Sequence, residues 1–177
     1  MNITFHDTPS PYATVTDVFD TQDLQTFQQI ADQAPMGDSW IENNNMDQYA
    51  WKLYHKIYPT LNRKTQDRNN CLECSTDASF FKIQIKKLEP GFKRNRIHTD
   101  SDWKQFVTVV YLDGQGLGTK LYASNEGDPE RVIPYIHNTG YSMIPNATSW
   151  HDFDHSADFT EIRTTLMFIL ANRGFYK

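Results

Sequence analysis

The chain has 177 residues, of which 38% are hydrophobic, 14% aromatic and 22% charged, and its formal net charge is −5. This composition predicts one globular domain and argues against disorder, while the negative charge disfavours the backbone of a nucleic acid as a partner. Apolar runs such as TVVYL are too short to cross a bilayer, and the N-terminus has no signal-peptide pattern, so we expect a cytoplasmic protein without a membrane partner.

The first third of the sequence is predicted to be helical. Apolar residues recur at helical spacing after Asp20 and Thr21, and Pro35 closes the run. A second helix is expected over about 46–61, where apolar residues again fall on one face. A polar loop should follow over roughly 62–77.

From residue 78 the pattern changes to short segments rich in β-branched and aromatic residues, with Gly, Pro, Asn and Asp between them. The predicted strands are 78–88, 106–112, 119–124, 131–136, 140–145 and 163–170. Many short strands at regular spacing predict a sandwich or a barrel. We therefore expect a mixed α/β (α+β) protein with one domain over 1–177, in which the helical part, about 1–77, covers one sheet of the β part, about 78–177.

Cys71 and Cys74 form a single C-x-x-C pair in the polar stretch DRNNCLECSTD. One pair without a second pair nearby is weak evidence for zinc. The context is also unlike the strand-to-helix junction of a thioredoxin-like redox motif. We interpret the pair as two thiols in a loop, with a redox pair as the alternative.

His98 and Asp100 form an H-x-D motif just after a predicted strand and turn. Residues i and i+2 of an extended strand point to the same face, so the imidazole and the carboxylate should point together. One more histidine would complete a two-His, one-carboxylate set that leaves metal positions open for other ligands. The remaining histidines are His6, His55, His137, His151 and His155.

We predict that His151 is the third ligand. It follows a strand-like run and a Pro-Asn turn beside Trp150, so ordered backbone would hold it. His155 lies among acidic residues, where an imidazole should be mobile and easily protonated. Arg163 opens the last predicted strand, where burial is costly unless the guanidinium meets an anion such as a carboxylate.

Taken in order, these segments resemble the non-haem iron(II), 2-oxoglutarate-dependent oxygenases, and most closely their small prolyl-hydroxylase-like branch. The resemblance covers roughly residues 80–171 and rests on LEPGFKRNRIHTD, FVTVVYLDGQGLGTKLY, GYSMIPNATSWH and RTTLMFILAN. The chain departs from the family pattern at Leu88, at Leu117-Gly118 and at Asp152.

The resemblance implies a double-stranded β-helix core, also called a jelly-roll or cupin-like core. It implies His98, Asp100 and His151 as iron(II) ligands and Arg163 as the partner of the distal carboxylate of 2-oxoglutarate. Tyr111 is either a hydroxyl partner of that cosubstrate or an ordinary tyrosine lining the barrel. The implied cofactors are Fe(II) and 2-oxoglutarate, with ascorbate as an optional addition.

The activity implied by the resemblance is hydroxylation of an unactivated carbon with release of succinate and CO2. The substrate would be a prolyl residue, a free amino acid or another small metabolite. Two alternatives remain: a nucleic-acid demethylating oxygenase, which the net charge disfavours, and a non-catalytic jelly-roll protein that binds a metal or ligand. An intact H-x-D motif and the presence of Arg163 argue against the non-catalytic alternative.

Two further groups of residues bear on the substrate. The basic run KKLEPGFKRNR would either steer an acidic substrate or form a solvated turn. Aromatic residues would either line a substrate groove or pack in the core and at its rim. These aromatic residues are Trp40, Trp103, Trp150, Tyr122 and Tyr135.

Overall fold

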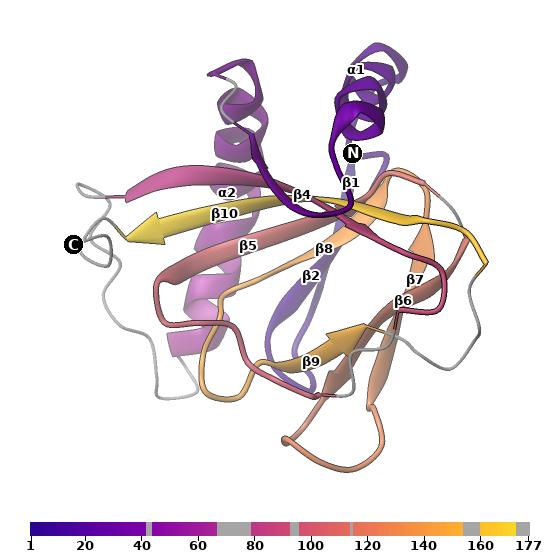
Figure 1. Ribbon diagram of the computed structural model, residues 1–177. Helices are drawn as coiled ribbons and strands as arrows, with labels where there is room; N and C mark the ends of the chain where they lie inside the picture. Colours follow the sequence, from indigo (N-terminus) through magenta and orange to yellow (C-terminus); the bar gives the residue numbers. More distant parts are fainter. Residues whose placement is uncertain (42–43, 67–78, 93–95, 114, 154–159, 173–177) are drawn as a thin grey trace.

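The computed structural model describes residues 1–41, 44–66, 79–92, 96–113, 115–153 and 160–172 (Figure 1). Cys71, Cys74 and His155 lie outside these residues, so their predicted roles stay predictions. Among the described residues, no helix is long and apolar enough to span a membrane.

The described residues form two antiparallel sheets and two helices. The larger sheet has the strand order β1-β2-β8-β5-β10-β4-β3, and the smaller sheet has the order β7-β6-β9. The strands of the larger sheet are β1 (Asn2–His6), β2 (Tyr12–Thr16), β3 (Gly37–Ile41), β4 (Ser79–Leu88), β5 (Lys104–Tyr111), β8 (Thr139–Met143) and β10 (Arg163–Asn172). The strands of the smaller sheet are β6 (Gln115–Tyr122), β7 (Arg131–Ile136) and β9 (Trp150–Phe153).

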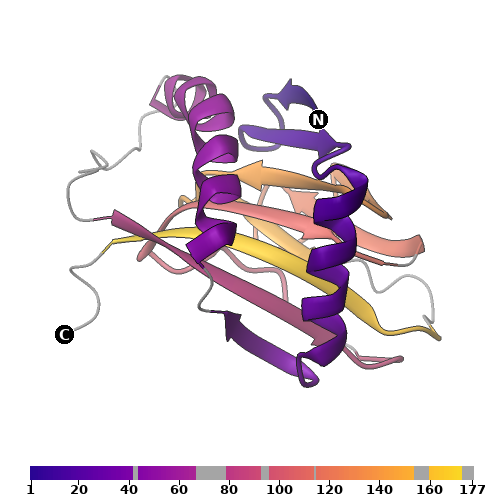
Figure 2. The ribbon, with the colours of Figure 1, turned by 90° about the horizontal axis from the view of Figure 1, so that it is seen from above.

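The smaller sheet faces one side of the larger sheet, and helices α1 (Thr21–Gln33) and α2 (Asn44–Gln66) cover the other side (Figures 1 and 2). Alternation along β10 illustrates this division of the core. Phe168 packs with the helices, whereas its neighbour Ile169 packs between the sheets. The arrangement confirms the predicted α+β class and the jelly-roll core with helices on one sheet.

The two predicted helices are confirmed, with a difference at one boundary. The Asp20 carboxylate caps α1 by accepting a hydrogen bond of 2.9 Å from the backbone N–H of Asp23. Helix α2 continues to Gln66 instead of ending near residue 61. Thr65 is buried, and its hydroxyl donates to the carbonyl of Leu61, so the last turn still packs against the core.

The expectation that the first third is helical was incomplete, because β1, β2 and β3 also lie there. Strand β2 pairs with β8, and β3 pairs with β4, so each is joined to a partner far along the chain. Short segments of this kind carry little intrinsic signal, because pairing and burial decide their conformation. The turn predicted before His151 is present at residues 147–148, and His151 follows it within strand β9.

Candidate metal centre

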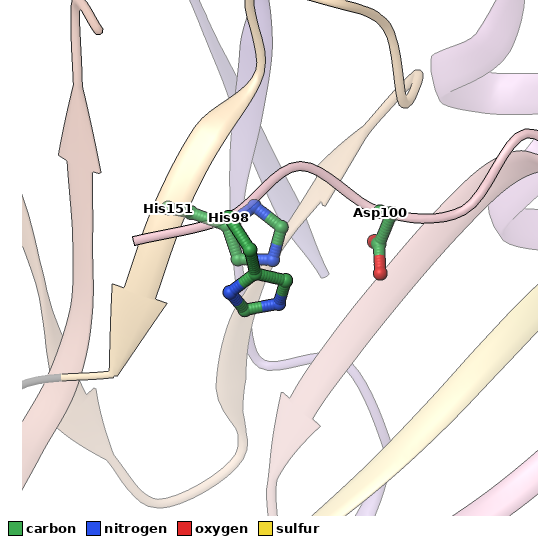
Figure 3. Close-up of side chains that lie close together, drawn as sticks. All are labelled: His98, Asp100 and His151. Atoms are coloured by element: carbon green, nitrogen blue, oxygen red, sulfur yellow. The ribbon is translucent and has the colours of Figure 1, made fainter. Parts of the chain in front are cut away.

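His98, Asp100 and His151 come together at the edge of the space between the sheets (Figure 3). One potential ligand atom of each side chain lies within 4.8 Å of those of the other two. The two imidazole rings have their centroids 4.5 Å apart. All three side chains line a cavity of about 350 Å³, and within the described part of the chain no other group of His, Cys, Asp or Glu could hold a metal in this way.

A backbone bridge brings the two histidines together. The N–H of His98 donates to the carbonyl of His151 at 3.0 Å, and the N–H of His151 donates back to the carbonyl of His98 at 2.8 Å. Strand β9 is held in turn by β6, where His151 lies opposite Leu121. The expected strand through the H-x-D motif is reduced to this isolated bridge, so the bridge to β9 orients the motif.

The hydrogen bonds of the imidazoles leave one nitrogen of each ring for a ligand. His98 Nδ1 lies 3.2 Å from the carbonyl oxygen of Arg96, and His151 Nδ1 lies 2.9 Å from that of Ser149. Because a carbonyl oxygen only accepts, each Nδ1 carries the hydrogen and each Nε2 presents a lone pair. Metal-bound histidines are oriented by outer hydrogen bonds of this kind.

Asp100 forms an ion pair with Lys104, four residues along the chain. The Asp100 side chain is only 10% exposed and that of Lys104 only 14%. Burial alone raises the pKa of the Asp100 carboxyl, but the positive charge of Lys104, electrostatic interaction with His151 and His98, and the hydrogen bond from Lys104 together bring it below its usual range. The carboxylate is therefore ionised and available to a cation.

The donor set fits a divalent transition metal. Two imidazole nitrogens and one carboxylate oxygen are the ligands of non-haem Fe(II) sites with open positions. Metal–ligand bonds of about 2.0–2.2 Å place two ligand atoms of one ion at most about 4.4 Å apart. Small rotations of the three side chains, whose ligand atoms already lie within 4.8 Å, would thus bring them onto a single ion.

Arg163 occupies another part of the same cavity. It is the first residue of β10 and only 7% exposed. Its guanidinium carbon lies 5.6 Å from the ring centroid of Tyr111, 5.1 Å from that of Tyr135 and 5.4 Å from that of Phe153. The aromatic rings stabilise the cation, and a planar guanidinium in the cavity suits a carboxylate.

Tyr111 lies next to Arg163 and is fully buried. Its hydroxyl oxygen is 2.9 Å from Oγ1 of Thr119. Burial raises the pKa of the phenol, and the charge of Arg163 only partly opposes this effect. Tyr111 therefore stays neutral at physiological pH. It is a buried barrel residue next to the guanidinium, and its role as a hydroxyl partner of the cosubstrate stays a prediction.

The structure adds Tyr135 and Asp113 to the surroundings of Arg163, neither of which the sequence indicated in this role. The Tyr135 hydroxyl donates to the Asp113 carboxylate and lies 2.8 Å from the carbonyl of Thr164. Asp113 also accepts a 2.8 Å bond from the backbone N–H of Thr164. This network fixes the backbone at the start of β10. It therefore also fixes the point from which the Arg163 side chain projects.

Three other histidines of the described residues, His6, His55 and His137, do not line the cavity. Nε2 of His6 is 3.0 Å from Oγ1 of Thr14, and His137 Nδ1 is 2.9 Å from the carbonyl of Leu112. His55 is exposed on α2. Of the aromatic candidates for a groove, Trp40 and Trp103 line the cavity.

Comparison with solved structures identifies the fold. A prolyl-4-hydroxylase of Pseudomonas putida superposes with a TM-score of 0.62 at 12% identity, over 91% of this chain and 92% of that one. A 2OG-Fe(II) oxygenase family oxidoreductase of Burkholderia pseudomallei gives a TM-score of 0.54 at 14% identity, over 90% and 85%. The epimerase SnoN from nogalamycin biosynthesis, in complex with Fe3+, alpha ketoglutarate and nogalamycin RO, gives 0.51 at 13% identity, over 91% and 78%.

No family model matches the chain, and no curated protein matches it. The structural similarities show that the chain has the double-stranded β-helix fold seen in 2-oxoglutarate, iron(II) oxygenase structures.

Proposed function

We propose that the protein is an iron(II)- and 2-oxoglutarate-dependent dioxygenase that hydroxylates an unactivated carbon. The observation that carries the proposal is the convergence of His98, Asp100, His151 and Arg163 on one cavity of this fold. The similar structure of SnoN contains Fe3+ and alpha ketoglutarate, which is another name for 2-oxoglutarate, and so supports the same pair of ligands.

In this proposal His98 and His151 bind the metal through Nε2, and Asp100 binds it through the carboxylate. Arg163 grips the distal carboxylate of 2-oxoglutarate, and the neutral hydroxyl of Tyr111 donates a further hydrogen bond to it. A bound iron(II) supplies the activation of oxygen that attack on an unactivated carbon requires.

The walls of the cavity assist by excluding water. Val107 and Val109 of β5 and Met167 and Ile169 of β10 present apolar side chains to the cavity. An apolar lining strengthens the charge interactions at Arg163 and protects a reactive centre from side reactions. The substrate is proposed to be a prolyl residue, a free amino acid or another small metabolite, which the similarity to a prolyl-4-hydroxylase supports.

The test is coupled turnover of 2-oxoglutarate. The purified protein with Fe(II), 2-oxoglutarate and oxygen should form succinate and consume oxygen, and His98→Ala should abolish both. His55→Ala is the matched control, because this histidine is exposed on α2. Failure of the wild-type protein to bind a divalent metal would refute the proposal, as would an unchanged rate in His98→Ala.

A further inference from the structure

Trp40, Trp103 and Lys104 line the cavity, and Lys82 lies beside both indole rings. In the larger sheet Lys82 lies opposite Ile169, and Trp40 lies opposite Gln84 of β4. Lys104 lies opposite Ala171, eight residues beyond Arg163 along β10, which corresponds to about 27 Å of strand. Lys104 and Arg163 therefore lie at opposite ends of the space between the two sheets, and the candidate metal centre lies between them.

Tyr141 lines the cavity together with His98, Asp100 and His151. Tyr141 is paired with Val109, and Val109 is paired with Met167, four residues along β10 from Arg163. A cosubstrate stretched from the metal to Arg163 would fill that half of the cavity and leave the half lined by Lys104 for the primary substrate.

Both ammonium groups approach one indole. Lys82 Nζ is 5.9 Å from the ring centroid of Trp103 and 4.9 Å from that of Trp40. Lys104 Nζ is 5.6 Å from the ring centroid of Trp103, on a side chain that is only 14% exposed. Two positive charges this close to one ring form a local field that favours an anion.

Metal binding would change the surroundings of Lys104. Its ion-pair partner is Asp100, which is also the carboxylate of the candidate metal site. A divalent ion bound to Asp100 would balance the carboxylate charge in place of Lys104 and would itself repel the Lys104 ammonium. Asp38, another carboxylate of the cavity wall, is 3.3 Å from Lys86 and so is already paired. A nearly buried ammonium then requires a new anion, because an uncompensated charge there is costly.

We propose that the primary substrate carries a carboxylate, which the ammonium of Lys104 binds beside Trp103 on the side of the metal away from Arg163. This inference rests on the proposed oxygenase function and narrows its substrate to a small carboxylic acid, such as a free amino acid. Trp40 and Trp103 contact the carbon skeleton, and Lys82 attracts the anion at the rim. An internal residue of a neutral peptide lacks the group that Lys104 recognises.

Iodide quenching of tryptophan fluorescence tests the anion site without turnover. Iodide is an anionic probe, and acrylamide is its neutral control. Loading the protein with Mn(II) should raise the iodide quenching constant at least twofold and leave that of acrylamide unchanged, because Lys104 is released from Asp100. Lys104→Met should remove the rise, and Trp103→Phe should remove the signal that reports it. Lys52→Met, which deletes an exposed lysine of α2, is the matched control and should keep the rise.

The outcomes separate the inference from the function on which it rests. Mn(II) binding is measured independently by the loss of the free-ion electron paramagnetic resonance signal. If Mn(II) binds but iodide quenching is the same in wild type and Lys104→Met, the anion site is refuted while the metal centre stands. If Mn(II) does not bind, the metal centre is refuted and the inference falls with it.

Matched acid and amide pairs show whether the carboxylate that binds belongs to a free amino acid or to the end of a peptide. L-Proline and L-glutamate are compared with L-prolinamide and L-glutamine amide, and a blocked neutral peptide is compared with the same peptide ending in a free carboxylate. Free amino acids should relieve iodide quenching in Mn(II)-loaded protein at concentrations at least tenfold lower than their amides. Relief by the free-carboxylate peptide alone would assign the site to a peptide end, and equal relief by acids and amides would overturn the proposal.

Discussion

Arg163 is the residue whose surroundings most directly suggest an anionic ligand, since the rings of Tyr111, Tyr135 and Phe153 lie around its guanidinium. Charge-assisted, two-pronged hydrogen bonds contribute about 1.5–3 kcal/mol each. Arg163→Ala should therefore weaken binding of 2-oxoglutarate about 10- to 100-fold while Mn(II) binding stays intact. Arg163→Lys should recover only part of the affinity, because an ammonium lacks the planar fork. Calorimetric titration of the Mn(II)-loaded protein measures both constants, and an unchanged affinity in Arg163→Ala would remove this role.

The second prediction at the residue scale is that His151, and not His155, completes the metal site. His151 is only 8% exposed, and two backbone hydrogen bonds tie it to His98. Its ring is oriented by the carbonyl of Ser149, so Nε2 is directed without further rearrangement. Loss of one of three ligands should lower metal affinity at least 100-fold.

The test compares His151→Ala with His155→Ala by equilibrium dialysis against Mn(II). Binding should collapse in the first variant and persist in the second. The opposite result would show that the neighbouring histidine is the ligand. Circular dichroism of both variants separates loss of the ligand from loss of the fold.

At the scale of secondary-structure elements, the close pairing of β8 with β5 depends on Gly140. A Cβ added at this position would lie 1.9 Å from the carbonyl oxygen of Val109, so the two strands would have to separate. Overpacking of this kind costs about 2–3 kcal/mol. Gly140→Ala should lower the free energy of unfolding by that amount in urea denaturation.

Gly127→Ala provides the comparison for Gly140→Ala. Gly127 has φ +97° and no atom within 4 Å of an added Cβ, so only backbone strain opposes the substitution. Its cost should be about 1 kcal/mol. Equal effects of the two substitutions would show that β5 and β8 can move apart freely, contrary to the prediction.

The elements differ in how far the sequence predicts them. Strands β4, β5 and β10 are long and rich in β-branched and aromatic residues, and α1 and α2 show helical periodicity, so local pattern was sufficient. Strands β1 and β3 are short edge strands whose conformation depends on distant partners.

The same distinction applies to the site. His98, Asp100, His151 and Arg163 were proposed from motif and spacing, and the structure brings all four to one cavity. The sequence did not predict a role for Lys104, although it lies only four residues after Asp100. An i,i+4 ion pair is expected on a helix, and this segment is not helical. The contact of Tyr135 with Asp113 joins strand β7 to the loop after β5, and the spacing of the two residues in the sequence does not indicate it.

At the scale of the whole molecule, the larger sheet separates two cores with different tasks. On one side it packs with the helices through residues such as Phe168, which lies in edge contact with Phe19 at 6.4 Å. On the other side Ile169, Val107 and Val109 face the smaller sheet and the cavity. The helical layer therefore stiffens the sheet from behind, so that the candidate site can remain hollow without loss of the fold.

The last prediction concerns the charge of the whole molecule: binding to duplex DNA at physiological salt should be weak. The net charge is −5, and the basic run KKLEPGFKRNR is the densest cluster of positive charge in the sequence. Part of that run is engaged within the fold. Lys86 pairs with Asp38, and the Lys87 ammonium donates to the carbonyls of Ala31 and Ala34 at 3.1 and 3.2 Å.

Proteins that neutralise 6–10 phosphates lose about 10³- to 10⁵-fold in affinity between 50 and 200 mM salt. With a net charge of −5 and part of its basic run engaged in the fold, this protein should show a micromolar or weaker dissociation constant and a shallow salt dependence. Fluorescence anisotropy with a labelled 20-base-pair duplex across that salt range measures both quantities. A tight complex with a steep salt slope would contradict the prediction and would favour a nucleic-acid demethylating oxygenase over an enzyme for small carboxylic acids.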